Sequence, residues 1–256
     1  MPLTRKLSCV VRLSSSEEAC LSDLQRHPVH IKRGTDLARE GQTAHGAFIL
    51  HSGWACRYKD LREGGRQIIS FSLPGDFMGL GSILLRSSDH SFAALTDVLV
   101  SPISVPSLMA LFEKFPRIAA AILWAESRDA AIVIEHLVDV GRRSSVERVA
   151  HCLLELRQRL QLVGLASETE FECPLTQYDL ADALGLSPIH VNRVLRQLRQ
   201  QNLLTLKSHR AVVHDLAGLI KLAGYDSDYL DQAFADKVSS TRWNGAVPML
   251  HDQLGQ

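Results

Sequence analysis

Residues 175–204 read LTQYDLADALGLSPIHVNRVLRQLRQQNLL and contain two short helical patterns on either side of a glycine. Thr176 is suited to cap the first helix, and Gly185 permits the tight turn after it, because glycine adopts left-handed backbone angles easily. Ser187, followed by Pro188, predicts the start of the second helix. Two short helices joined by such a turn are typical of the helix-turn-helix, whose second helix fits the major groove of DNA.

The second helix has an apolar stripe and a polar, basic opposite side. Val191, Val194, Leu195 and Leu198 recur at helical spacing and are expected to be buried. The segments LLTL and AVVH, on either side of KSHR, predict a short β-hairpin with a basic tip, the wing of a winged helix. The residues expected to contact DNA are Thr176, Gln177, Ser187, Ile189, His190, Asn192, Arg193, Arg196, Lys207, His209 and Arg210.

Charge is distributed unevenly along a chain that is neutral as a whole. The 256 residues include 28 Lys and Arg against 28 Asp and Glu, yet no acidic residue occurs from Ala183 to His214. Because a DNA-binding protein must neutralise phosphates, this basic segment is where a duplex is expected to bind. The alternative is a solvated basic face that contacts RNA or another protein.

Residues from about 28 to 105 form a series of short strand patterns punctuated by glycine, among them GAFILHSGWACRYKD and RQIISFSLPGDF. Regularly spaced short strands with glycine turns predict an antiparallel barrel or jelly roll. We expect helices at the N-terminus to precede this roll.

From Arg117 to Val140 the chain is mostly apolar, which predicts a long helix. Its apolar surface is wider than one packing face needs, so we expect it to contact its own roll on one side and a second copy on the other. The residues assigned to this dimer contact are Ile118, Ile122, Ala125 and Ile132. The alternative is a helix buried wholly within its own chain.

Ser144, followed by Glu147, has the spacing of a capping box and predicts a new helix after a hinge at residues 141–143. The predicted fold class is therefore α+β. An effector domain of N-terminal helices and β-roll occupies 1–115, a dimerisation helix 116–141, a winged helix-turn-helix 142–224, and a C-terminal tail without a predicted element 225–256.

Several classes of protein are not supported by the sequence. No stretch offers the roughly 20 apolar residues that span a bilayer, and the N-terminus lacks the apolar core of a secretory signal, so a cytoplasmic location is expected. The five cysteines form no Cys-x-x-Cys pair. We find no GxSxG, Walker-type loop or HExxH motif, and enzymatic activity is not predicted.

The roll with SLPGDFMGLGS, the long helix and the segment LTQYDLADALGLSPIHVNRVL together resemble the Crp/Fnr family of bacterial transcription regulators, over about residues 20–224. The resemblance implies a cyclic-nucleotide-binding-like roll and a homodimer whose long helices pair side by side. Each winged helix would enter one half of a near-palindromic operator, and the dimer would act on RNA polymerase. The segments PGDFMGL and ALTDV are similar to the FixK-like branch, which is poor in cofactors.

The effector pocket departs from the cyclic-AMP-binding members of that family. Their Gly-Glu pair corresponds in position to Gly79-Leu80, and their Arg-Ser or Arg-Ala pair to His90-Ser91. Leu80 offers no acceptor to a ribose hydroxyl, and His90 offers no bidentate partner to a phosphate. Cyclic AMP is therefore not expected, and Arg86 is the candidate that would substitute for the missing arginine.

No cofactor is predicted, but two kinds of effector stay open. Cys9 and Cys20 do not reproduce the N-terminal cysteine cluster of the iron-sulfur members. A small molecule in the altered pocket is one alternative, and haem is the other. The histidines in or near the roll that could ligate haem are His30, His45, His51 and His90.

The resemblance aligns Arg193 with the guanine-contacting arginine of the family. Many members place a glutamate where this chain has Ile189, whose apolar side chain would instead meet a thymine methyl group. Asn192 is expected to pair with adenine, and His190 with a base edge or a phosphate. The residues assigned to phosphates are Arg196, Lys207, His209 and Arg210.

Cys173 lies three residues before Thr176. If its thiol is exposed, its oxidation would place a bulky or charged group near the DNA-binding surface and act as a redox switch. The alternative is an inert packing cysteine.

Overall fold

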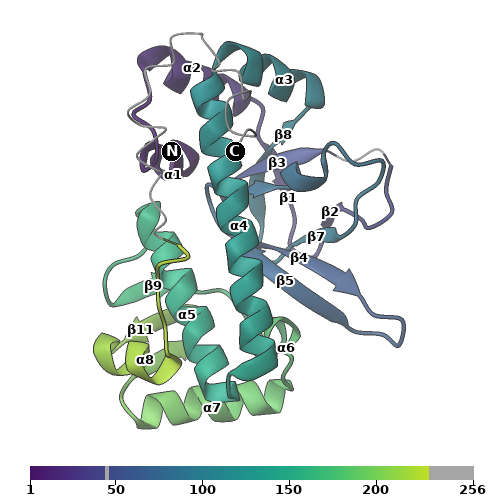
Figure 1. Cartoon of the computed structure of the whole chain (residues 1–256). Helices are drawn as coiled ribbons and strands as arrows, with labels where there is room; N and C mark the ends of the chain where they lie inside the picture. The colour runs from purple at the N-terminus through teal and green to yellow at the C-terminus, as the bar shows by residue number, and fades with distance from the viewer. Residues whose placement is uncertain (44–45, 231–256) are drawn as a thin grey trace, which may run out of the picture.

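The computed structural model of the chain describes residues 1–43 and 46–230. Its central element is α4 (Pro116–Arg142), which has the strands of the N-terminal domain on one side and the C-terminal domain around its lower end (Figure 1). None of the helices in these two ranges is long and apolar enough to cross a membrane.

The N-terminal domain contains a roll of two antiparallel four-stranded sheets, as predicted. One sheet has the order β1 (Val29–Ile31), β8 (Val98–Ile103), β3 (Ala47–Ser52) and β6 (Phe77–Met78). The other has the order β2 (Asp36–Ala38), β7 (Ser91–Ala94), β4 (Ala55–Asp60) and β5 (Arg66–Ser72). The β3–β4 turn requires glycine, because at Gly53 (φ +81°) a β-carbon would lie 2.3 Å from the carbonyl oxygen of Asp97.

Three helices pack at one end of the roll, in the upper part of Figure 1: α1 (Pro2–Ser8), α2 (Ser15–Leu24) and α3 (Val105–Lys114). Leu3 and Leu7 of α1 are buried in one apolar cluster with Ile118 and Ile122 of α4. The upper half of α4 is therefore part of the core of its own N-terminal domain.

The long helix is confirmed, but the side assigned to a dimer contact is buried within the chain. Ile118, Ile122, Ala125 and Ile132 are each at most 2% exposed. The assignment of a dimer contact to these four residues is therefore wrong, because they leave no surface for a partner. A different apolar set of α4 stays exposed: Leu123, Ile134 and Leu137, at 68%, 63% and 73%.

The C-terminal domain begins with α5 (Ser145–Leu162), where Ser144 and Glu147 form the predicted capping box. It continues with β9 (Glu170–Glu172), α6 (Gln177–Leu184), α7 (Pro188–Gln200), β10 (Leu204–Lys207), β11 (Arg210–Val213) and α8 (Leu216–Ala223). The strand order β10-β11-β9 confirms the predicted wing hairpin and adds β9, which was not predicted.

The chain beyond α8 folds back along α5 as far as it is described (Figure 1). The hydroxyl of Tyr229 donates to Glu155 Oε2 at 3.1 Å. The carbonyl oxygen of Leu230 accepts from Arg128 Nε of α4 at 3.0 Å. The predicted tail therefore begins with a segment packed on two helices, and residues 231–256 lie outside the described ranges.

Candidate nucleic-acid interface

The two helices of the quoted stretch begin and end where the sequence predicts. Gly185 has φ 64° and ends α6. Ser187 caps α7 by accepting a hydrogen bond from the backbone N of His190 at 3.2 Å. The buried residues of α7 are Val191, Val194 and Leu198. Leu195, which was expected to be buried with them, is only partly buried. Asn192, Arg193 and Arg196 are exposed, so the polar side of α7 faces outward.

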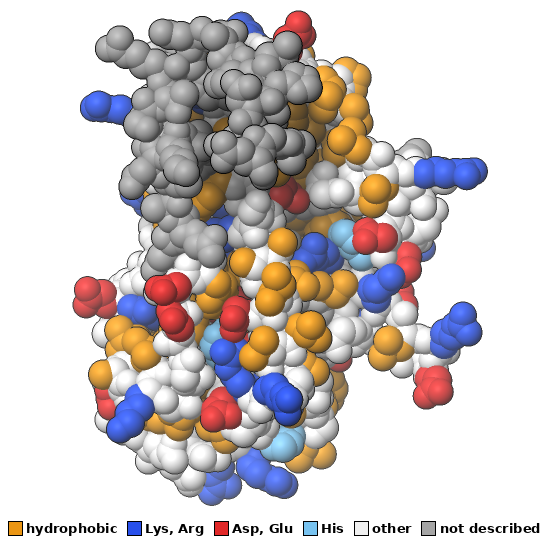
Figure 2. Space-filling view, in the orientation of Figure 1, with side chains coloured by type: hydrophobic (Ala, Val, Ile, Leu, Met, Phe, Trp, Pro, Cys, Tyr) orange, Lys and Arg blue, Asp and Glu red, His pale blue; other side chains and the backbone are white. Residues whose placement is uncertain are grey.

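Most of the residues predicted to contact DNA are exposed on α6, α7 and the wing. They are Gln177, Ile189, Asn192, Arg193, Arg196, Lys207 and His209. Figure 2 shows basic side chains along the lower edge of the molecule, where Figure 1 places α7. Ile189 of α7 is 76% exposed, and Tyr178 of α6 is 70% exposed. Tyr178 was not among the residues predicted to contact DNA. Its position on the side of α6 opposite Leu180 could have indicated that it is exposed.

Two of the predicted contact residues have a structural role in the helices. Thr176 Oγ1 accepts a hydrogen bond from the backbone N of Asp179 at 3.2 Å in the capping box of α6. Ser187 is likewise the cap of α7. These hydroxyls satisfy the free backbone groups at the helix starts, so they position the interface.

Two further predicted contact residues are engaged with other parts of the chain. His190 Nε2 lies 3.0 Å from Ser145 Oγ, at the start of α5. Arg210 forms an ion pair with Glu170 across strands β11 and β9. The assignment of Arg210 to a phosphate stays a prediction, and the exposed carboxylate of Glu170 would compete with that phosphate.

The wing turn is built from two residues with left-handed backbone angles, Ser208 (φ 51°) and His209 (φ 61°). Positive angles at both central residues are typical of the tightest hairpin turns. Lys207 pairs in register with Arg210 on either side of this turn. The exposed side chains of Lys207 and His209 therefore lie at the tip of the wing.

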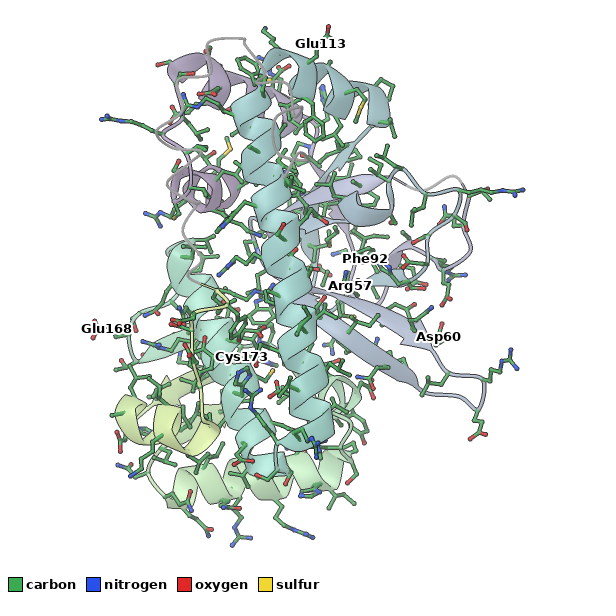
Figure 3. The ribbon with its side chains drawn as sticks, viewed as in Figure 1. Arg57, Asp60, Phe92, Glu113, Glu168 and Cys173 are labelled. Atoms are coloured by element: carbon green, nitrogen blue, oxygen red, sulfur yellow. The ribbon has the colours of Figure 1, made fainter. Side chains whose placement is uncertain are left out.

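Cys173 lies inside the C-terminal domain (Figure 3). Its side chain is 0% exposed, and burial raises the pKa of the thiol to about 12. Oxidation needs an accessible thiolate, so the condition for a redox switch, an exposed Cys173, is not met. The structure supports the alternative, an inert packing cysteine. The backbone N of Cys173 donates to the carbonyl of His209 at 2.8 Å and so ties this segment to the wing.

Sequence reasoning missed Arg66 of β5, which holds the helix-turn-helix against the roll. Its Nη2 lies 3.0 Å from Asp179 Oδ1, and its Nε lies 2.9 Å from Asp182 Oδ2. Gln67 Nε2 donates to the carbonyl of Ala183 at 3.1 Å. The β4–β5 hairpin is thereby clamped onto α6. No local pattern signals this contact, because the paired residues are 113 and 116 positions apart.

A cavity of about 460 Å³ lies in the roll beside α4. Of the predicted effector residues, Gly79, Leu80 and His90 line it; Leu80 begins the short helix η1 (Leu80–Ser82). Arg86 is exposed, and Ser91 Oγ accepts from the backbone N of Glu40 at 3.0 Å. Arg86 therefore does not substitute for the missing arginine, and the arginines that line the cavity are Arg57 and Arg159.

The lining of this cavity does not fit a cyclic nucleotide. Leu80 gives no acceptor to a ribose, and His90 Nδ1 lies 2.6 Å from Asp89 Oδ1. Burial and the charge of Arg57 lower the pKa of His90, which disfavours a charged ring that could pair with a phosphate. The carboxyl group of Asp129 interacts electrostatically with Arg57, and it would repel a phosphate bound there.

The histidines considered for haem are in different surroundings. His30 is exposed, His51 Nε2 lies 2.7 Å from Ser101 Oγ, and His90 lines the cavity. His45 lies outside the described residues. Within 1–43 and 46–230, no group of three or more His, Cys, Asp or Glu is arranged to hold a metal ion.

Known families match both halves of the chain. The family model of the Crp-like helix-turn-helix domain matches residues 147–222, and that of the cyclic nucleotide-binding domain matches residues 28–115. The nitrogen fixation regulation protein FixK of Bradyrhizobium diazoefficiens is 31% identical over 180 residues, which cover 70% of this chain and 74% of the relative. FixK of Azorhizobium caulinodans is 30% identical over 187 residues, 73% and 74% of the two chains.

A solved structure agrees with these matches. FixK2 from Bradyrhizobium japonicum has a TM-score of 0.70 and 27% identity, with 78% of this chain and 98% of that chain covered. The two FixK relatives are named nitrogen fixation regulation proteins, which supports a regulatory function and not catalysis. The exposed helix α7, the wing, the β-roll and these relatives together show that the chain belongs to the Crp/Fnr family of DNA-binding transcription regulators and is FixK-like.

Proposed function

We propose that the chain regulates transcription as a homodimer whose α4 helices pair through the side that contains Leu123, Ile134 and Leu137. Positions 123, 127, 130, 134 and 137 follow one another in steps of four and three, the spacing of a coiled-coil seam. Three large apolar side chains exposed on one helix face favour a protein partner. Since a two-fold axis at this seam repeats α7, the dimer would offer two recognition helices to a near-palindromic operator.

The observation that carries the proposal is the exposed polar side of α7. Arg193 is suited to guanine O6 and N7, and Asn192 to adenine. Ile189, 76% exposed at the start of α7, is suited to a thymine methyl group. The residues proposed to contact phosphates are Arg196, Lys207 and His209.

We further propose that the bound dimer acts on RNA polymerase and works without cyclic AMP. Two relatives named transcriptional activators, FnrA of Stutzerimonas stutzeri and AadR of Rhodopseudomonas palustris, support an action at promoters. The chemistry of the cavity argues against cyclic AMP, since neither Leu80 nor His90 fits it. Of the two alternative effectors, haem and a small molecule, the cavity favours the small molecule.

Selection of bound sequences from a random DNA pool with the full chain tests the proposal. The expected result is a site with two half-sites whose centres lie about 10 base pairs, one helical turn, or a multiple of it apart. Arg193→Ala should lose the base preference at one position of each half-site, whereas Arg86→Ala, a matched change at an exposed arginine of the roll, should keep the full selected sequence. A single asymmetric half-site, or no enriched sequence, would contradict the dimer on a near-palindrome.

A further inference from the structure

Residues 225–230, which follow α8, form a segment that we call the C-terminal strap. It runs along α5, on the opposite side of α4 from the β4–β5 hairpin (Figure 1). The match to the Crp-like helix-turn-helix model ends at residue 222, before the strap begins. The strap is therefore a feature of this chain that the family match does not explain.

Two tyrosines of the strap pack on α5. The ring of Tyr225 lies edge-on to His151 with the ring centroids 5.0 Å apart, and the ring of Tyr229 is stacked on His151 at 6.0 Å. The Tyr225 hydroxyl donates to Gln158 Oε1 at 2.8 Å. His151 is fully buried, and the two rings are part of what covers it. The strap is thus packed into the DNA-binding domain.

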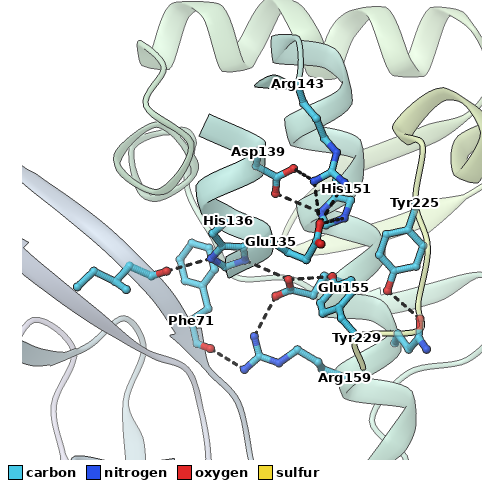
Figure 4. A network of polar contacts seen from close by, with 12 residues as sticks. Phe71, Glu135, His136, Asp139, Arg143, His151, Glu155, Arg159, Tyr225 and Tyr229 are labelled. Carbon is cyan, nitrogen blue, oxygen red and sulfur yellow. Dashed lines mark hydrogen bonds and ion pairs between the residues drawn. The ribbon is translucent and has the colours of Figure 1, made fainter. Parts of the chain in front are cut away.

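Two consecutive residues of the strap contact opposite sides of the α4–α5 hinge, residues 143 and 144. The Tyr229 hydroxyl donates to Glu155 Oε2 of α5 at 3.1 Å (Figure 4). The carbonyl oxygen of Leu230 accepts from Arg128 Nε of α4 at 3.0 Å. Because Glu155 follows the hinge and Arg128 precedes it, the strap ties the DNA-binding domain to the long helix.

Both contacts are made to charged groups inside the molecule. Glu155 is 1% exposed, and Arg128 is 6% exposed. Release of the strap would break both hydrogen bonds and expose Leu230, which is only 3% exposed in the folded chain. Because hydrogen bonds to charged groups and the burial of apolar side chains both stabilise a fold, the strap stays bound to both helices.

The strap leaves the surfaces proposed for DNA and for the second copy uncovered. Arg193 of α7 is exposed, and so is Leu137 of α4. The strap therefore does not mask these surfaces, but fixes the angle between the DNA-binding domain and α4. The Arg66 clamp, through which β5 binds Asp179 and Asp182 of α6, holds the same domain at another point. Two points of attachment restrain rotation about the hinge.

We propose that Tyr229 and Leu230 are positioning residues for DNA binding, which hold the DNA-binding domain at the angle that lets both α7 helices of a dimer fit one operator. This step rests on the proposed dimer. A full operator engages two α7 helices at a fixed spacing, whereas a half-site engages one. Release of the strap lowers the fraction of dimers with both helices correctly placed, and the apparent affinity for the full operator falls with that fraction. Affinity for a half-site does not depend on this angle.

Hydrogen exchange of the full chain without DNA tests whether the strap restrains the hinge. In Tyr229→Ala/Leu230→Ala, the amides of residues 139–148 should exchange about 10-fold faster, whereas those of β3 should keep their rates. Asp228→Ala, at an exposed residue of the same strap, should change neither. If the double variant does not fold, Leu230→Ala is measured in its place. Unchanged exchange around the hinge in the variant measured would overturn the proposal.

Fluorescence anisotropy with the selected operator and with a single half-site tests the positioning role. The double variant should bind the operator about 10-fold more weakly and the half-site within about twofold of the unchanged chain. Tyr229→Phe/Leu230→Met, which keeps the ring and the apolar volume, should recover most of the operator affinity. Equal losses on both duplexes would overturn the proposal, because they indicate a general loss of structure.

Sedimentation equilibrium of the same samples should show unchanged dimerisation. A weaker dimer in the double variant would also overturn the proposal, since the operator would then be lost through the seam. An unchanged chain that binds operator and half-site equally counts against the proposed dimer alone, and the hydrogen-exchange result then decides whether the strap restrains the hinge.

Discussion

Asp76, in the turn before β6, and Arg159, on α5, form a buried ion pair that joins the roll to the DNA-binding domain. Asp76 Oδ2 lies 2.8 Å from Arg159 Nη2, and Asp76 Oδ1 lies 2.8 Å from Lys6 Nζ of α1. Burial alone would raise the pKa of Asp76, but the charges of Lys6 and Arg159 lower it to about 2. One carboxylate therefore holds together three segments that are distant in the sequence.

Asp76→Asn should destabilise the chain strongly, because it leaves two buried cations without their shared anion. Breaking a buried pair by removing one partner costs about 3–5 kcal/mol, which should appear as a lower free energy of unfolding in urea. Asp23→Asn, which removes an exposed pair with Arg26, should change it by less than about 1 kcal/mol. Because the folded pKa of Asp76 is lowered, its contribution is present above pH 4 and is lost as the pH falls towards 2. Equal stability of the two variants would contradict this role.

A second buried network links α4 to α5 (Figure 4). His136 Nε2 lies 3.0 Å from Glu155 Oε2, and His136 Nδ1 lies 3.0 Å from the carbonyl oxygen of Ile69. Burial alone would lower the pKa of His136, but the charge and hydrogen bond of Glu155 raise it to about 9. The imidazolium is thus held between two acceptors at the junction of the domains.

The pH dependence of stability should reveal this histidine. Its folded pKa lies above the ordinary value of 6.5, so its contribution is fully present below pH 6.5 and is lost as the pH rises through 9. On the order of 3 kcal/mol of unfolding free energy should disappear over this range. In His136→Gln the loss between pH 6.5 and 9 should be much smaller, as measured by urea unfolding at each pH. The same slope in both proteins would show that His136 is not the group that titrates.

Local signals predicted the DNA-binding domain well. Ser144, Thr176 and Ser187 each cap a helix through a backbone N–H three residues ahead, and Gly185 ends α6 with left-handed angles. These interactions are complete within one helical turn, so the sequence alone contains all of the partners.

Contacts between distant segments could not be predicted in this way. Apolar residues occur on more than one side of α4, and only the packing of α1 and the roll determines that Ile118 is buried while Leu137 is exposed. Arg210 lies in an acid-free segment, yet β9 brings Glu170 beside it. In each case the missing information is which other element covers the residue.

Leu137→Glu should convert the proposed dimer to a monomer. Leu137 is 73% exposed in the single chain, so the change leaves the fold intact but places an unpaired carboxylate in the seam of both copies. The cost of about 3–5 kcal/mol should weaken dimerisation by a factor of roughly 100 or more, as measured by sedimentation equilibrium. Leu84→Glu, at a position 72% exposed in the loop after η1, should leave the dimer unchanged. A dimer that survives Leu137→Glu would place the interface elsewhere.

Arg193→Ala and Lys207→Ala should weaken DNA binding in different ways, because one residue is proposed to contact a base and the other a phosphate. Arg193→Ala should cost about 1–3 kcal/mol on the selected operator and relax its specificity at one position. Lys207→Ala, at the wing tip, should weaken binding to operator and random duplexes alike and reduce the salt dependence by about one counterion. Fluorescence anisotropy with both duplexes over a series of salt concentrations separates the two effects. If both variants lose equal affinity on operator and random DNA, Arg193 is a phosphate contact, and sequence recognition must come from other residues of α7.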